Sequence, residues 1–105
     1  MKFIKTEEEF ENAKRDDCMI VFLPDDEIDE YLEKGVLNQI SEDTSDWKFY
    51  VAYAHSLIDV CVKEEIMQLP AIYTWCDGEG YTSGDLCEGE ELADNIADWY
   101  ADEAE

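Results

Sequence analysis

The sequence is poor in basic residues and has no long hydrophobic run. Only 7 of its 105 residues are Lys or Arg, against 29 Asp or Glu, and the net charge at pH 7 is -22. A surface of that charge repels phosphates and anionic lipids, so direct binding to nucleic acids or membranes is not expected. No apolar run reaches the about 18 residues of a membrane-spanning helix, and the acidic N-terminal stretch lacks the apolar core of a signal peptide. We therefore expect a cytoplasmic protein.

Reactive cysteine pairs and histidine clusters are also missing. The four cysteines, Cys18, Cys61, Cys76 and Cys87, form no C-x-x-C pair, and with His55 as the only histidine no cluster has the spacing of a zinc site. In a cytosolic chain, such thiols are expected to stay reduced and to act as small apolar side chains. The acidic residues between positions 26 and 30 match no calcium-loop spacing. No metal and no cofactor is expected.

The hydrophobic content is high enough for a folded core despite the charge. Hydrophobic residues make up 46% of the sequence and aromatic residues 12%, so disorder is not expected. The length suits a single domain that spans residues 1–105. The charge itself has three interpretations: a highly soluble surface, adaptation to high salt, or an acidic face for a basic partner, including mimicry of nucleic-acid charge. Composition alone leaves all three open.

The first residues predict a strand, a helix and a second strand. Residues 2–6 alternate as in a short strand, and a helix is expected from Glu7 to about Lys14. Thr6 and Glu9 have the spacing of a capping box at the start of that helix. The continuous apolar run 18–23 is typical of a central strand that is buried on both faces.

A longer helix and another strand are expected next. Asp25 or Asp26 is placed to cap a helix that runs to about Ser41 on an apolar stripe of helical period. Gly35 lies inside this helix and marks a kink or a close contact. Strand 47–54 follows a polar loop.

The second half of the chain contains a proline between a short helix and a strand. Proline cannot donate to a sheet ladder, so it belongs at the first residue of a strand or on an edge. A short helix capped by Ser56 is expected before Pro70, and the strand 71–76 after it. An Asp77-Gly78 hairpin turn then leads to an edge strand 81–87 with a bulge at Gly84, and a last helix covers residues 89–101. The complete order is βαβαβαββα.

This order and several local sequences resemble the thioredoxin family over nearly the whole chain. The matching segments are Thr6-Glu7-Glu8-Glu9-Phe10, Val21-Phe22, Lys48-Phe49-Tyr50-Val51, Ile66-Met67-Gln68-Leu69-Pro70-Ala71-Ile72-Tyr73 and Asp77-Gly78, which align in the same order with almost no gaps. The resemblance implies an α/β, thioredoxin-like fold with a central mixed five-stranded sheet flanked by helices. It also implies a cis peptide bond between Leu69 and Pro70.

The active-site motif of that family is not conserved in this sequence. Counted on from Phe22, the family's W-C-G-P-C motif falls on residues 26–30, and both cysteine positions are glutamates, Glu27 and Glu30. The buried acid that assists proton transfer in the family falls on Val21. Dithiol chemistry needs a low-pKa thiolate and a resolving thiol one turn further on. We therefore expect no disulfide oxidoreductase activity at this site.

The sequence favours a redox-inactive adaptor that binds another protein through the groove beside the proline corner. The partner expected is a protein with a basic or amphipathic segment, without direct nucleic-acid or membrane binding. The predicted binding residues form an apolar strip with an acidic rim: Asp25, Asp26, Glu27, Ile28, Met67, Gln68, Leu69 and Pro70.

Two other functions remain open from the sequence. One is a diverged thiol oxidoreductase that uses a lone cysteine, such as Cys61 or Cys87. The other is an acidic nucleic-acid mimic that inhibits a DNA-binding protein; if it is virus-encoded, its location would be the host cytoplasm. This mimic would need carboxylates at roughly phosphate spacing on one face.

Overall fold

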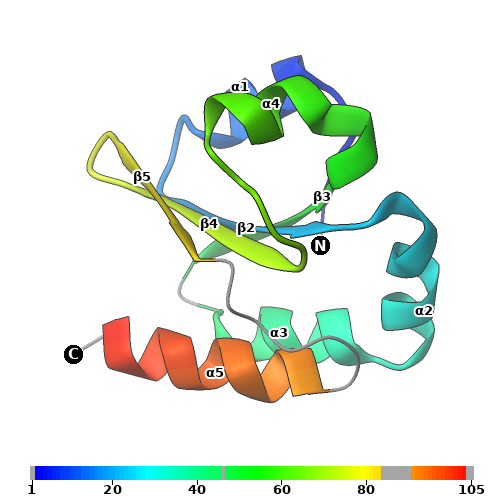
Figure 1. Ribbon diagram of the computed structural model, residues 1–105. Coiled ribbons are helices and arrows are strands. Elements are labelled where there is room, and N and C mark those ends of the chain that lie inside the picture. The colour runs from blue at the N-terminus through cyan, green and yellow to red at the C-terminus, as the bar shows by residue number, and fades with distance from the viewer. Residues whose placement is uncertain (1, 46, 84–90, 104–105) are drawn as a thin grey trace.

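A mixed five-stranded sheet forms the centre of the protein (Figure 1). The structure is a computed structural model that describes residues 2–45, 47–83 and 91–103. Its elements are β1 (Lys2–Ile4), α1 (Glu7–Ala13), β2 (Cys18–Leu23), the 3-10 turn η1 (Asp25–Glu27), α2 (Ile28–Glu33), α3 (Val36–Asp43), β3 (Lys48–Tyr53), the 3-10 turn η2 (Ala54–Leu57), α4 (Ile58–Lys63), β4 (Ala71–Cys76), β5 (Glu79–Ser83) and α5 (Glu91–Glu103).

The strands are ordered β1-β3-β2-β4-β5. β3 runs parallel to both β1 and β2, whereas β4 is antiparallel to β2 and to β5. All six residues of β2 are buried, because this strand has a neighbour on each side and helices on both faces. This confirms the predicted α/β fold with a mixed sheet.

Each face of the sheet carries its own layer of helices and its own hydrophobic cluster. Figure 1 shows α1 and α4 on one face and α3 and α5 on the other. Successive side chains of a strand point to opposite faces, so Val21 packs with the α2, α3 and α5 side and Phe22 packs with the α1 and α4 side. β3 alternates in the same way, with Val51 and Ala52 in different clusters.

The predicted capping box at the first helix is confirmed. The backbone N–H of Glu9 donates to Oγ1 of Thr6 at 3.2 Å, and the backbone N–H of Thr6 donates to Oε1 of Glu9 at 3.2 Å. The N–H of Lys5 donates to the same carboxylate at 3.0 Å. Amide groups that a helix start leaves without partners are therefore satisfied within the segment itself.

The prediction of a single long helix from Asp25 or Asp26 to about Ser41 is wrong. The chain forms the turn η1 and then two separate helices, with Gly35 between α2 and α3 at a φ of +74°. Apart from its two chain neighbours, no described residue has an atom within 4 Å of the position that a Cβ on Gly35 would occupy. The backbone conformation, and not close packing, is therefore what requires glycine here.

The hairpin and the last helix agree with the sequence in type and differ at their ends. β4 has the predicted bounds 71–76, while β5 begins at Glu79, before the predicted Tyr81. Asp77 and Gly78 form the turn with φ angles of 54° and 79°, as expected for a two-residue hairpin loop. The predicted bulge at Gly84, the strand end 84–87 and helix residues 89–90 lie outside the described residues.

Candidate functional site

The candidate site lies at the sheet edge where β2 and β3 end and β4 begins. In the sheet register, Leu23 is opposite Tyr53 and Phe22 is opposite Ala71. The turn η1 after β2, the turn η2 after β3 and residues 66–70 before β4 therefore leave the sheet at one edge, as Figure 1 shows. This topology brings together segments that are far apart in the sequence.

The proline corner combines a buried support with an exposed apolar side chain. The Leu69–Pro70 peptide bond is cis, and Pro70 is buried directly before β4, where the missing N–H of proline costs no ladder hydrogen bond. Met67 is 90% exposed, Gln68 is exposed, and Leu69 is half-buried. The corner therefore presents Met67 to solvent above a buried proline.

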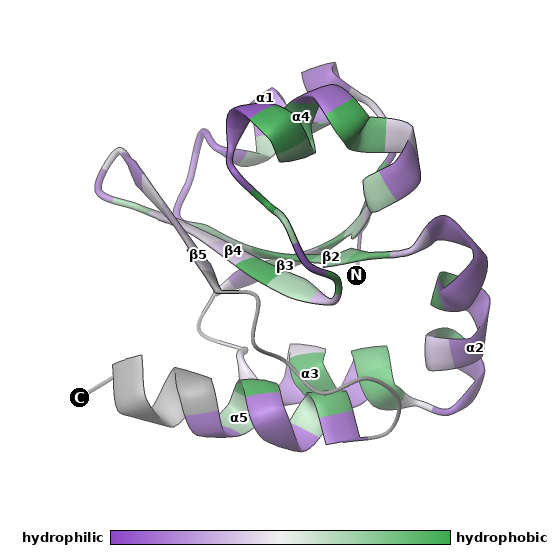
Figure 2. Cartoon of the chain, in the orientation of Figure 1, coloured by the Kyte–Doolittle hydropathy of each residue, from purple (hydrophilic) through white to green (hydrophobic). Residues whose placement is uncertain are grey.

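Acidic residues follow β2 at the same edge. Asp26 is exposed and Glu27 is half-buried, and Figure 2 colours this connection as strongly hydrophilic. Glu30 is exposed one turn later, and its carboxylate pairs with Nζ of Lys34 at 3.0 Å. Ile28 is fully buried, so like Pro70 it supports the surface from beneath and is not available to a partner.

Asp25 connects the two turns at this edge. Its Oδ1 accepts a hydrogen bond from the backbone N–H of His55 at 2.9 Å, and its Oδ2 accepts one from Oγ of Ser56 at 2.7 Å. The sequence-based prediction that Asp25 or Asp26 and Ser56 cap their own helices is therefore wrong. The side chains of Asp25 and Ser56 pair with each other because the parallel strands β2 and β3 end side by side.

The surroundings of the described thiols disfavour the reactive thiolate. Burial, followed by the negative charge of Asp17, raises the pKa of Cys18 to about 11. Burial raises the pKa of Cys61, and burial followed by Asp17 and Asp77 raises that of Cys76. A nucleophilic cysteine needs the opposite shift. Cys87 lies outside the described residues.

One group of side chains in the described part of the chain places possible metal ligands close together. Ligand atoms of Asp17, Cys76 and Asp77 lie within 4.8 Å of one another. The backbone N–H of Asp77 also donates to Oδ1 of Asp17 at 3.4 Å. A metal ligand must be the thiolate form of cysteine, which the raised pKa of Cys76 disfavours.

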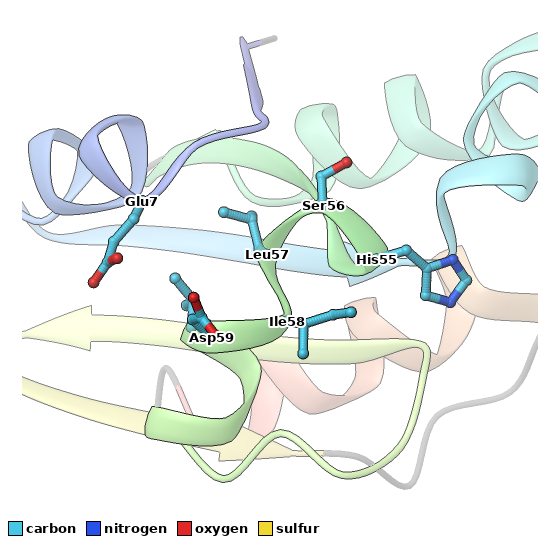
Figure 3. Close-up of a pocket in the computed structure, with 7 residues that line it drawn as sticks. Glu7, His55, Ser56, Leu57, Ile58 and Asp59 are labelled. Carbon is cyan, nitrogen blue, oxygen red and sulfur yellow. The ribbon is translucent and has the colours of Figure 1, made fainter.

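Sequence reasoning missed a hollow on the α1 and α4 side of the sheet. It has a volume of ≈ 370 Å³ and is lined by Glu7, His55, Ser56, Leu57, Ile58, Asp59 and Val60 (Figure 3). Ile58 in its lining is 62% exposed, and Val62, one helical turn further along α4, is 74% exposed. The sequence pattern that would have indicated this surface is the position of Ile58 and Val62, which lie off the buried stripe formed by Leu57 and Val60.

Comparison with known proteins supports the fold. The sequence matches no protein-family model and no curated protein. The structure is similar to that of a designed protein, with a TM-score of 0.74, 19% identity and coverage of 99% of this chain and 97% of the other. It is also similar to Plasmodium falciparum thioredoxin, with a TM-score of 0.68, 12% identity and coverage of 95% and 99%. Arabidopsis thaliana thioredoxin O1 in its oxidized state is similar with a TM-score of 0.65 and 16% identity, over 93% of this chain and 95% of the other.

The chain therefore has a thioredoxin-like fold, as its sequence order implied. Within the part of the chain that the structure describes, every helix is too short or too polar to cross a membrane.

Proposed function

We propose that this protein is a redox-inactive, thioredoxin-like adaptor that binds a protein partner at the proline corner. The binding surface consists of the accessible residues Asp26, Glu27, Met67, Gln68 and Leu69, and we call it the corner surface. Ile28 and Pro70 support it from the interior, and Asp25 holds the neighbouring turn in place.

The observation that carries this proposal is the exposure of Met67 at the same edge of the sheet from which the acidic turn η1 leaves. A methionine side chain that is 90% exposed adapts its flexible thioether to a partner surface at little cost. The carboxylates of Asp26 and Glu27 favour a segment that carries Lys or Arg beside its apolar residues. The net charge of -22 makes such a partner more favourable than an acidic one.

The absence of redox activity is proposed from the thiol environments and from the glutamates at the motif positions. Glu27 and Glu30 cannot form a disulfide, and the pKa values of Cys18, Cys61 and Cys76 are raised. In a turnover assay with a small disulfide substrate, we expect no rate above the uncatalysed one, with an active thioredoxin as the positive control. Turnover that disappears on Cys61→Ser or Cys87→Ser would instead establish a lone-cysteine oxidoreductase.

Binding is tested with a short fluorescent peptide of alternating Leu and Lys residues, measured by anisotropy at low and at physiological salt. Met67→Ser is expected to weaken binding about fivefold to tenfold, because apolar area is lost from the interface. Asp26→Lys together with Glu27→Lys is expected to weaken binding and to reduce its salt dependence.

The matched control is Glu33→Lys together with Glu42→Lys, which makes the same change in net charge on α2 and α3. Both residues are exposed, and the control should weaken binding much less than the change at Asp26 and Glu27. Equal effects of the two charge reversals, with no effect of Met67→Ser, would show only non-specific attraction to an acidic protein.

A further inference from the structure

The outer face of α4 carries an apolar pair that the core does not use. Ile58 is 62% exposed and Val62 is 74% exposed, and residues four apart are neighbours on a helix surface. The same short helix already buries Val60 against the sheet. Figure 2 colours much of α4 as hydrophobic, and the exposed fractions place Ile58 and Val62 on its outer face.

The hollow on the α1 and α4 side adjoins the exposed pair Ile58 and Val62, because Ile58 is one of the residues that line it. Figure 3 shows Glu7 of α1 and Asp59 of α4 on one side of the hollow, and Ile58 and His55 on the other. Glu7 and Asp59 are both exposed. A Lys or Arg side chain can lay its aliphatic stem along Ile58 and bring its charge to these carboxylates.

The charge of the protein limits what can cover this face. A second copy of the chain would also carry -22, and nucleic acids and anionic membranes would be repelled in the same way. The local cations do not reverse this, since Lys63 at the opposite end of α4 lies 3.9 Å from the carboxylate of Glu11. The face therefore complements a cationic protein segment.

We propose that the outer face of α4, formed by Ile58 and Val62 with the adjoining hollow, docks a basic amphipathic helix of a partner protein. The apolar residues of that helix pack on Ile58 and Val62, at the spacing of one helical turn. A Lys or Arg of the same helix enters the hollow between Glu7 and Asp59. This surface is separate from the corner surface and does not depend on the function proposed there.

The test uses two synthetic peptides of identical composition, Leu and Lys. In one peptide the Leu residues lie on a single helical face, and in the other they are distributed around the helix. We expect the amphipathic peptide to bind the intact protein about tenfold more tightly than the scrambled one. Equal affinity for the two peptides would overturn the proposal, because charge alone would then account for binding.

Variants of the protein locate the binding surface. Ile58→Ser together with Val62→Ser is expected to weaken binding of the amphipathic peptide about tenfold, whereas Tyr81→Ser, which removes an exposed aromatic residue on β5, should not. Asp59→Asn should weaken binding more than Glu42→Asn on α3. The NMR spectrum of each variant reports whether it folds, and the exposure of all these side chains favours folding.

Met67→Ser separates this proposal from the corner surface. If Ile58→Ser together with Val62→Ser weakens binding of the amphipathic peptide and Met67→Ser leaves it unchanged, the result supports docking on α4. The reverse result overturns the α4 proposal and supports the corner surface. If the two changes weaken binding equally and their effects add, the peptide covers both surfaces and α4 is still part of the interface.

Discussion

Each face of the sheet covers a buried hydrophobic cluster, but the two helix layers differ on the outside. Buried aromatic rings occur in both clusters: Tyr31 and Phe49 lie under α2, α3 and α5, and three more rings lie together under α1 and α4. Phe10, Phe22 and Tyr73 pack there with ring centroids 5.3–6.5 Å apart.

The outward-facing side chains show where the two layers diverge. Among the side chains that the structure describes, the large exposed hydrophobic residues are Ile58 and Val62 on α4, Met67 at the corner and Tyr81 on β5. None of them lies on α2, α3 or the described part of α5. The α1 and α4 layer and the adjoining edge thus carry these exposed apolar residues, while the described side chains on the outside of the other layer include no large exposed hydrophobic residue.

The largest expected effect tests whether both cores are firmly packed. Phe10 is 1% exposed and Leu37 is fully buried, so Phe10→Ala should lower the free energy of unfolding by about 3–5 kcal/mol and Leu37→Ala by about 2–5 kcal/mol. Urea unfolding followed by circular dichroism measures both. A loss for Phe10→Ala much smaller than the loss for Leu37→Ala would mean that the α1 and α4 layer is loosely packed. The exposed apolar residues of that layer would then be explained by loose packing and would not indicate a binding partner.

A second prediction concerns the close approach of β5 to the aromatic cluster. A Cβ at Gly80 would overlap the hydroxyl of Tyr73, so Gly80→Ala should destabilise the fold by about 1–3 kcal/mol. Adding Tyr73→Phe should recover part of that loss. Gly35→Ala is the matched control, because its cost comes from a positive φ and no atom lies nearby; Tyr73→Phe should not relieve it.

Tyr73→Phe in the parent protein is informative too. The Tyr73 hydroxyl is buried and has no hydrogen-bond partner among the described residues. Burial, with the nearby charge of Glu64, also raises the pKa of Tyr73, which keeps the hydroxyl neutral. Removing it should leave stability unchanged or raise it by up to about 1 kcal/mol. A clear loss of stability would show that the hydroxyl is hydrogen-bonded in solution.

A third prediction concerns the link between the two layers. Asp25 lies in the turn that leads to α2, and its partners His55 and Ser56 lie in the turn that leads to α4. Asp25→Ala should cost about 1–2 kcal/mol and should speed hydrogen exchange at the His55 amide. Asp26→Ala, next to it and exposed, is the control and should change neither quantity. Equal behaviour of the two variants would contradict the proposed link.

A fourth prediction concerns how the helices of the two layers begin. Thr6 caps α1 with its side chain, whereas α3 begins at Gly35 without a side-chain cap. Thr6→Ala should therefore lower stability by about 1 kcal/mol. Thr6→Ser keeps the hydroxyl and should retain most of the stability. Thermal or urea unfolding of the pair measures the contribution of the cap, and equal losses would argue against it.

The smallest expected effect is the pH dependence of the same cap. The hydrogen bond from the Lys5 backbone, followed by those from Thr6, lowers the pKa of Glu9 in the folded protein. The unfolded chain then binds the proton more tightly, so this contribution is present above the unfolded pKa and is lost as pH falls through the folded pKa. Glu9→Gln should flatten that part of the stability profile, measured by urea unfolding across acidic pH. Glu8→Gln should leave it unchanged.

The order of elements could be predicted largely from the sequence because its determinants are local, whereas the mixed sheet was expected from the resemblance to the thioredoxin family. The capping box of Thr6 and Glu9, the apolar run of β2 and the Asp77-Gly78 turn each specify an element through neighbouring residues. The break at Gly35 was underestimated, because a helical pattern with a central glycine does not show whether that glycine adopts a left-handed conformation. The binding role of the corner residues remains a prediction.

The sequence by itself determined the order of elements and the excess of negative charge. Only the tertiary structure decided which residues share a surface. Asp25 meets Ser56, Ile28 and Pro70 are withdrawn into the interior, and Ile58 stays exposed beside Glu7. The physical reason is that these relations depend on which strand ends adjoin and on which helix face the sheet covers, and both are set by long-range packing.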